Sequence, residues 1–233
     1  MLRSLHFIFL TTFPLLLVGQ DTFTSNVNER GAWNYAGNWS RIGVADADGI
    51  PDSDDHVIIS SGDTIDLERD EAVNTLIINS AAVLNHTVGD KITVYGNYTN
   101  NGIQQEGSNS SDLIFVTDGI EIDGSGSISN TGQVIIAANI TIAATADLTI
   151  ELGTELIFSG AHTVTNNGVM DINDNFIGFT GCTWIQGTGS TLKFGHNTIP
   201  LRDAGTLDCS TNVNTFIYDK NNNHDSILPT TYH

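Results

Sequence analysis

The sequence predicts an all-β protein, a single-stranded right-handed parallel β-helix (β-solenoid) with an N-terminal cap. Three observations predict it: short runs of β-branched residues, corners rich in Gly and Asn between the runs, and no dozen-residue stretch with an apolar period of 3.6. Right-handedness is expected because parallel crossover connections overwhelmingly have that hand. The alternative architecture is a β-sandwich.

The predicted strands are runs of four or five residues rich in Val, Ile, Leu, Thr or aromatic side chains. Their spacing is irregular, and small residues crowd between them. This favours stacked coils of about 20 residues over the evenly spaced hairpins of a sandwich. The runs are residues 56–59, 75–78, 91–95, 113–116, 133–136, 139–142, 147–150 and 155–158.

Three corners share an Asn-x-Gly form and begin at Asn100, Asn130 and Asn166. Asn and Gly tolerate left-handed backbone angles, which tight corners require. Asn side chains at equivalent corners can also stack into hydrogen-bonded ladders. The corners therefore support a coil that repeats.

The first residues resemble an export signal. Arg3 supplies positive charge, an apolar stretch runs from Leu5 to Val18, and Gly19 suits cleavage before Gln20. The stretch is short and interrupted by Pro14, so a retained membrane anchor is the weaker interpretation. We expect a secreted or cell-surface protein whose mature chain does not insert into a membrane.

The expected division of the chain has three parts. Residues 1–19 form the signal peptide, residues 20–60 the N-terminal cap and first strands, and residues 61–233 the parallel β-helix. The chain of 233 residues is 39% hydrophobic, enough for one sizeable core. Its formal net charge of −19, with only 8 Lys and Arg, argues against nucleic acid, anionic lipid and acidic polysaccharides as partners.

Residues 31–102 carry an ordered series of motifs. The first are Gly31-Ala32-Trp33, Gly37-Asn38-Trp39 and Gly49-Ile50-Pro51, and the last ends in Asn100-Asn101-Gly102. In this order the segment resembles the repeat-rich surface proteins of Bacteroidetes, which begin with a Trp-containing cap and continue as a parallel β-helix. It is more distantly similar to the G8 module of some extracellular proteins. The C-terminal sorting domain common in the bacterial family does not follow, so the β-helix is expected to be truncated.

An acidic segment is the strongest chemical cluster. Asp46, Asp48, Asp52 and Asp54 alternate around a Gly turn, as carboxylates in Ca²⁺ sites do. The segment is similar to the Asp-x-Asp-Gly repeats of thrombospondin type 3 but lacks the full EF-hand pattern. The favoured alternative is a solvated acidic loop that leads into the first strand. The expected cofactor is therefore none, with Ca²⁺ as the alternative.

Two cysteines and three aromatic residues complete the candidate sites. Cys182 and Cys209 can form a disulfide in an exported protein, or remain two separate buried thiols. Trp33, Tyr35 and Trp39 can stack on sugars, although sealing the N-terminal end of the solenoid is the favoured role.

The functional hypothesis is an extracellular structural or adhesive display module that binds glycans or cell-surface proteins. One alternative is a carbohydrate-active enzyme, a polysaccharide lyase or glycoside hydrolase on a β-helix. The nearest carboxylate pairs are Glu151 with Glu155 and Asp171 with Asp174, and neither forms a known catalytic pattern. The expectation is therefore not an enzyme. The other alternative is a calcium-stabilised binding module.

Overall fold

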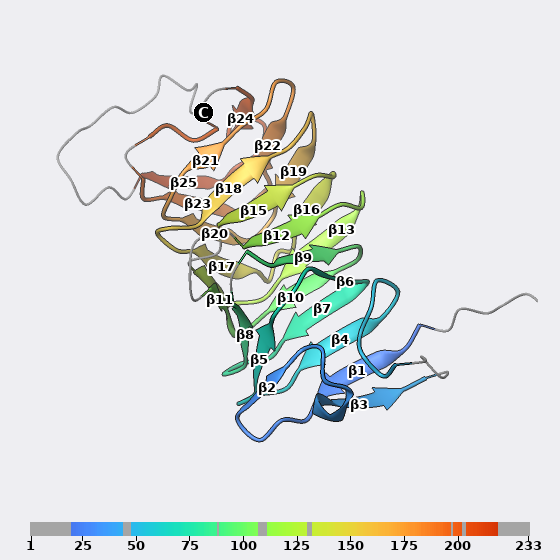
Figure 1. Cartoon of the computed structure of the whole chain (residues 1–233). Helices are drawn as coiled ribbons and strands as arrows, with labels where there is room; N and C mark the ends of the chain where they lie inside the picture. Colours follow the sequence, from blue (N-terminus) through green and yellow to red (C-terminus); the bar gives the residue numbers. More distant parts are fainter. Residues whose placement is uncertain are drawn as a thin grey trace, which may run out of the picture.

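Figure 1 shows the chain in a computed structural model, a stack of coils that rises from β1 to β25. The structure describes residues 20–43, 48–87, 89–106, 111–129, 132–196, 198–201 and 204–218. The predicted signal peptide lies outside these residues. Within them, no helix has the length and apolar character needed to cross a membrane.

Three sheets form the sides of the stack, and from β4 to β21 each coil adds one strand to each sheet in turn. Sheet A contains, in spatial order, β3 (Trp39–Ile42), β1 (Thr22–Ser25), β4 (His56–Ile59), β7 (Thr75–Ile78), β10 (Tyr98–Asn100), β13 (Ile120–Asp123), β16 (Ile140–Ile142), β19 (Thr163–Asn166), β22 (Thr183–Gln186) and β24 (Thr206–Asp208). Sheet B contains β2 (Arg30–Ala32), β5 (Thr64–Leu67), β8 (Val83–His86), β11 (Ile103–Glu106), β14 (Ser127–Ser129), β17 (Asp147–Ile150), β20 (Val169–Ile172), β23 (Thr191–Phe194) and β25 (Thr215–Tyr218). Sheet C contains β6 (Glu71–Val73), β9 (Lys91–Val94), β12 (Asp112–Phe115), β15 (Gln133–Ile136), β18 (Glu155–Phe158) and β21 (Phe176–Ile177).

The strand register confirms the parallel β-solenoid. Val57 pairs with Leu76, 19 residues further on, and Tyr98 pairs with Ile122, 24 residues further on. These separations agree with the predicted coil of about 20 residues. The β-sandwich alternative is wrong, because the pairs are parallel throughout the described strands except between β1 and β3.

The core is a column of stacked apolar side chains. Most strands bury every second residue, as in β4, β7, β12 and β18, so one row of each strand points inward. Each fully buried Ile, Leu or Val contributes roughly 1.5–3 kcal/mol relative to an exposed one. Side chains fill the middle of the column so well that the cavity there is about 20 Å³ and entirely apolar. The interior therefore offers no ligand site at that level.

Aromatic residues close the N-terminal end of the column. The rings of Trp33 and Trp39 lie edge to face with centroids 5.1 Å apart, and Phe23 packs against Trp39. Both Trp side chains are buried, so the idea that they stack on sugars is wrong, whereas Tyr35 is 64% exposed. The 3₁₀ turn η1 (Ala36–Asn38) leads into β3, which pairs antiparallel with β1 at the edge of sheet A. Since β1 and β4 are neighbours in sheet A, cap and coils share one sheet.

The Asn-x-Gly corners at Asn100 and Asn166 have the same structure. Each buried Asn accepts a hydrogen bond from the Gly backbone N–H two residues later, at 3.0 and 3.1 Å. Each also donates to a backbone carbonyl of the next coil, at 3.0 and 3.2 Å. Gly102 and Gly168 are required by crowding rather than by a left-handed φ, which corrects the expected reason. Asn130 lies outside the described residues.

The two cysteines are separate thiols, and the disulfide interpretation is wrong. Cys182 precedes β22, whereas Cys209 follows β24, which pairs with β22 in parallel. Parallel pairing therefore places the two residues about four positions apart along the strand direction, or roughly 13 Å. A disulfide needs Cα atoms within about 7 Å.

Candidate functional site

The outer face of sheet C carries an aliphatic row where a solvent-facing row of polar side chains is usual. Ile114 pairs with Ile135, Ile135 with Ile157, and Ile157 with Ile177, so the four side chains stack along the solenoid axis. We call these four residues the isoleucine row. All four are partly exposed. Their sequence signal is an Ile at the third position of the strands that begin at Asp112, Gln133 and Glu155.

A polar row runs beside the isoleucine row at the start of the same strands. It consists of Lys91, Asp112, Gln133, Glu155 and Asn175. The first four are successive partners in β9, β12, β15 and β18, and Asn175 directly precedes β21. From Asp112 onward the row alternates carboxylates and amides, and Lys91 places an ammonium group next to Asp112. Hydrogen-bonding groups therefore recur at the spacing of the strands, about 4.8 Å.

The groups of the polar row are bound to one another. Glu155 Oε1 accepts from Asn175 Nδ2 at 2.9 Å, and Glu155 Oε2 accepts from Gln133 Nε2 at 3.4 Å. Lys91 Nζ lies 3.7 Å from Asp112 Oδ2. Burial raises the pKa of Asp112, although the Lys91 ammonium lowers it in part. The geometry of the row is thus held in place before any ligand arrives.

All members of the polar row except Lys91 line an open groove of about 640 Å³. Asp174 enters the groove from the loop before β21, where it accepts a hydrogen bond from Gly153 N at 2.6 Å. His196 Nε2 lies 3.7 Å from Asp174 Oδ1. The lining residues are Asp112, Gly132, Gln133, Gly153, Glu155, Asp174 and Asn175.

The groove brings together one member of each carboxylate pair considered from the sequence. Glu155 and Asp174 both line it, whereas Asp171 lies on the outer side of β20 in sheet B, where it pairs with Lys193 at 3.9 Å. A corner between Asp171 and Asp174 turns them onto different faces. Proximity in the sequence was therefore a poor guide to which carboxylates share a site.

Two exposed aromatic residues bound the same face. Tyr95 directly follows β9 and is 44% exposed, and Phe179 lies two residues after β21 and is 47% exposed. Neither residue was predicted from the sequence, because the exposure of a single aromatic residue depends on its register within the sheet. Sheet C thus combines aliphatic, aromatic and hydrogen-bonding groups on one surface.

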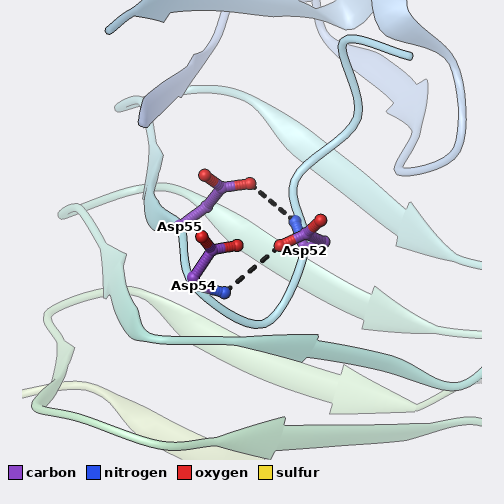
Figure 2. A group of neighbouring side chains, drawn as sticks. All are labelled: Asp52, Asp54 and Asp55. Atoms are coloured by element: carbon purple, nitrogen blue, oxygen red, sulfur yellow. Dashed lines mark hydrogen bonds between the residues drawn. The ribbon is translucent and has the colours of Figure 1, made fainter. Parts of the chain in front are cut away.

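The acidic segment is a second cluster, drawn in Figure 2. Oxygen atoms of Asp52, Asp54 and Asp55 lie within 4.8 Å of one another. The structure thus adds Asp55 to the predicted set. Asp48 accepts a hydrogen bond from Ile50 N at 2.9 Å instead, and Asp46 lies outside the described residues. With one oxygen from each, the three carboxylates supply three of the six to eight oxygens that Ca²⁺ takes, so an ion there needs bidentate carboxylates or further ligands.

The same carboxylates hold the turn that leads into β4. The buried Asp55 accepts backbone hydrogen bonds from Asp21 N at 3.2 Å and from Asp52 N at 2.8 Å, which joins the first two coils. Asp52 accepts from Asp54 N at 3.2 Å. The neighbouring Asp54 carboxylate raises the pKa of Asp52. These bonds make the cluster a structural turn whether or not a cation binds.

We expect Asp55→Ala to lower the free energy of unfolding by about 3 kcal/mol, since the buried N–H of Asp21 and the partly buried N–H of Asp52 lose a charged acceptor. The more exposed Asp54 is the matched control, and Asp54→Ala should cost less than about 1 kcal/mol. Urea denaturation measures both. Equal losses would show that the turn does not depend on the Asp55 carboxylate.

Comparisons with protein-family models, curated proteins and solved structures find no match to this chain.

Proposed function

We propose that this chain is an extracellular adhesive module that binds glycans on the outer face of sheet C. The observation that carries the proposal is the isoleucine row beside the groove that contains Asp112, Glu155 and Asp174. The export signal expected from residues 1–19 and the resemblance to bacterial surface proteins support an extracellular location.

The chemistry of this face suits a sugar. Carboxylates and amides bind hydroxyl groups as acceptors and donors, and they are already oriented by mutual hydrogen bonds. The apolar faces of sugar rings pack against aliphatic and aromatic side chains, as amphipathic rings do elsewhere. A ligand site commonly combines an apolar lining with a few placed polar groups.

Glycoside hydrolysis is the second candidate, favoured by the two carboxylates Asp112 and Glu155. They lie two strands apart, so their Cα atoms are roughly 10 Å apart. Inverting glycosidases separate their carboxyl groups by about 6.5–9.5 Å and raise the pKa of one of them, as burial does for Asp112. We prefer glycan binding to hydrolysis because the two carboxylates that hydrolysis would need already have partners. Both Glu155 oxygens accept hydrogen bonds from amides, and Asp112 pairs with Lys91.

Binding of the full chain to a panel of insoluble and soluble polysaccharides tests the proposal. We expect binding to at least one neutral polysaccharide, and about tenfold or more weaker binding by Glu155→Ala. Asp171→Ala, on the outer face of sheet B, is the control and should bind as the wild type does. Release of reducing ends would instead favour the hydrolase.

The same assay in CaCl₂ and in EDTA separates the calcium-stabilised module from the others. Binding that requires Ca²⁺ and is lost in Asp52→Asn would make the acidic cluster part of the function. Failure of every polysaccharide to bind the wild type would overturn the proposal.

A further inference from the structure

We infer that the ligand is a linear neutral glycan that lies along the solenoid axis, its rings over the isoleucine row and one edge against the polar row. The inference rests on the proposed function and adds the orientation, charge and length of the glycan. It follows from three features of sheet C: the direction of its repeat, its area and its charge.

The direction follows from the strand register. Along the axis, each step of about 4.8 Å brings another isoleucine and another polar side chain. Across the axis, a single strand offers one isoleucine and one member of the polar row. The step is comparable to the length of one sugar ring, so only the axial direction gives successive sugars equivalent contacts.

The area argues against a protein partner. The strands β12, β15 and β18 have four residues each, about 13 Å, and β21 has two, so a stack of roughly 19 Å gives their outer face at most about 250 Å². A stable protein interface takes about 800 Å² from each partner. A narrow strip of this size accommodates about four sugar rings, and the exposed Tyr95 and Phe179 lie toward its two ends.

The charge selects among glycans. The groove is lined by three carboxylates, those of Asp112, Glu155 and Asp174, and its lining residues include no Lys or Arg. Lys91, beside the groove, is paired with Asp112. A uronate polymer would place further carboxylates against these three and would be repelled, whereas neutral hydroxyl groups donate to them without that cost.

Oligosaccharides of one to six residues from the cello-, xylo-, manno- and laminari-series, with oligogalacturonides as the charged series, test the inference by calorimetry. For at least one neutral series, affinity should rise about tenfold or more from dimer to tetramer and less than about twofold from tetramer to hexamer. Oligogalacturonides should bind more weakly at every length.

Ile135→Arg fills the strip with a charged side chain from a partly exposed position and should weaken tetramer binding about tenfold or more. Ile77→Arg is its matched control, because Ile77 has the same outward position on β7 of sheet A. Thermal unfolding of both variants confirms that they fold.

The outcomes of these experiments distinguish an error in the axial orientation of the glycan from an error in the proposed function. Affinity that is independent of length, tightest binding to oligogalacturonides, or unchanged binding by Ile135→Arg would overturn the axial strip while leaving glycan binding intact. Absence of binding to every oligosaccharide and polysaccharide would overturn the proposed function itself.

Discussion

Replacing Gly168 with alanine is expected to cost about 3 kcal/mol or more of unfolding free energy, or to prevent folding. A Cβ atom there would lie 2.3 Å from the carbonyl oxygen of Ala143 and 2.6 Å from that of Ala146. Both atoms belong to the turn between β16 and β17, in which Ala146 N donates to Ala143 O at 3.1 Å and Ala143 N donates to Ile122 O of the coil before at 2.9 Å. The clash therefore cannot be relieved by rotation of a side chain.

The matched control separates crowding from backbone conformation. Gly119 has a φ of +83°, and an added Cβ would meet nothing within 4 Å. Gly119→Ala should therefore cost only about 1–2 kcal/mol for left-handed backbone strain. Urea denaturation of the two variants compares these costs. A larger loss for Gly119→Ala would mean that the coils can move apart to admit a side chain at Gly168.

The parallel coils were predictable because local patterns determine them. Each run of β-branched residues coincides with a strand to within one residue at either end, and the Asn-x-Gly triplets at Asn100 and Asn166 became equivalent corners. The reason for the Gly in these corners was wrong, because a sequence does not reveal how closely the preceding coil approaches. The distance between a glycine and the preceding coil depends on the lengths of all the coils that come before it in the stack.

The surface of sheet C was not predicted, for a related reason. Ile114, Ile135 and Ile157 lie 21 and 22 residues apart, while other coils differ in length by several residues. Without the register, a third-position Ile cannot be assigned to the core or to the outer face. The groove likewise collects carboxylates from three coils. Only the stacking of those coils places Asp112, Glu155 and Asp174 together.

Acidification is expected to destabilise the protein through a histidine inside the coils. His86 is fully buried, and its Nε2 lies 3.0 Å from Gln104 Nε2, which can donate only to a neutral imidazole. Gln104 in turn accepts from the buried Tyr98 hydroxyl at 2.8 Å. Burial lowers the pKa of His86 to about 4, although the nearby Asp90 raises it in part.

The direction of the effect follows from proton binding. The unfolded chain takes up a proton at its ordinary pKa of about 6.5, whereas the folded chain excludes it until about pH 4. The contribution of neutral His86 to the free energy of unfolding is therefore fully present above pH 6.5, and it falls as the pH is lowered toward 4. The loss should reach about 3 kcal/mol near pH 4 and then level off.

An apolar variant isolates this contribution from the many carboxylates of the chain. In His86→Leu with Gln104→Leu and Tyr98→Phe, the three side chains lose their hydrogen bonds to one another together. The Asp90 carbonyl, 3.3 Å from His86 Nδ1, loses that partner as well, but this cost is the same at both pH values and cancels in the comparison. We expect the fall in unfolding free energy from pH 7 to pH 4 to be about 3 kcal/mol smaller in this variant than in the wild type. Urea denaturation at both pH values measures the difference. An equal fall in the two proteins would place the proton uptake elsewhere and would mean that the folded coils tolerate a charged His86.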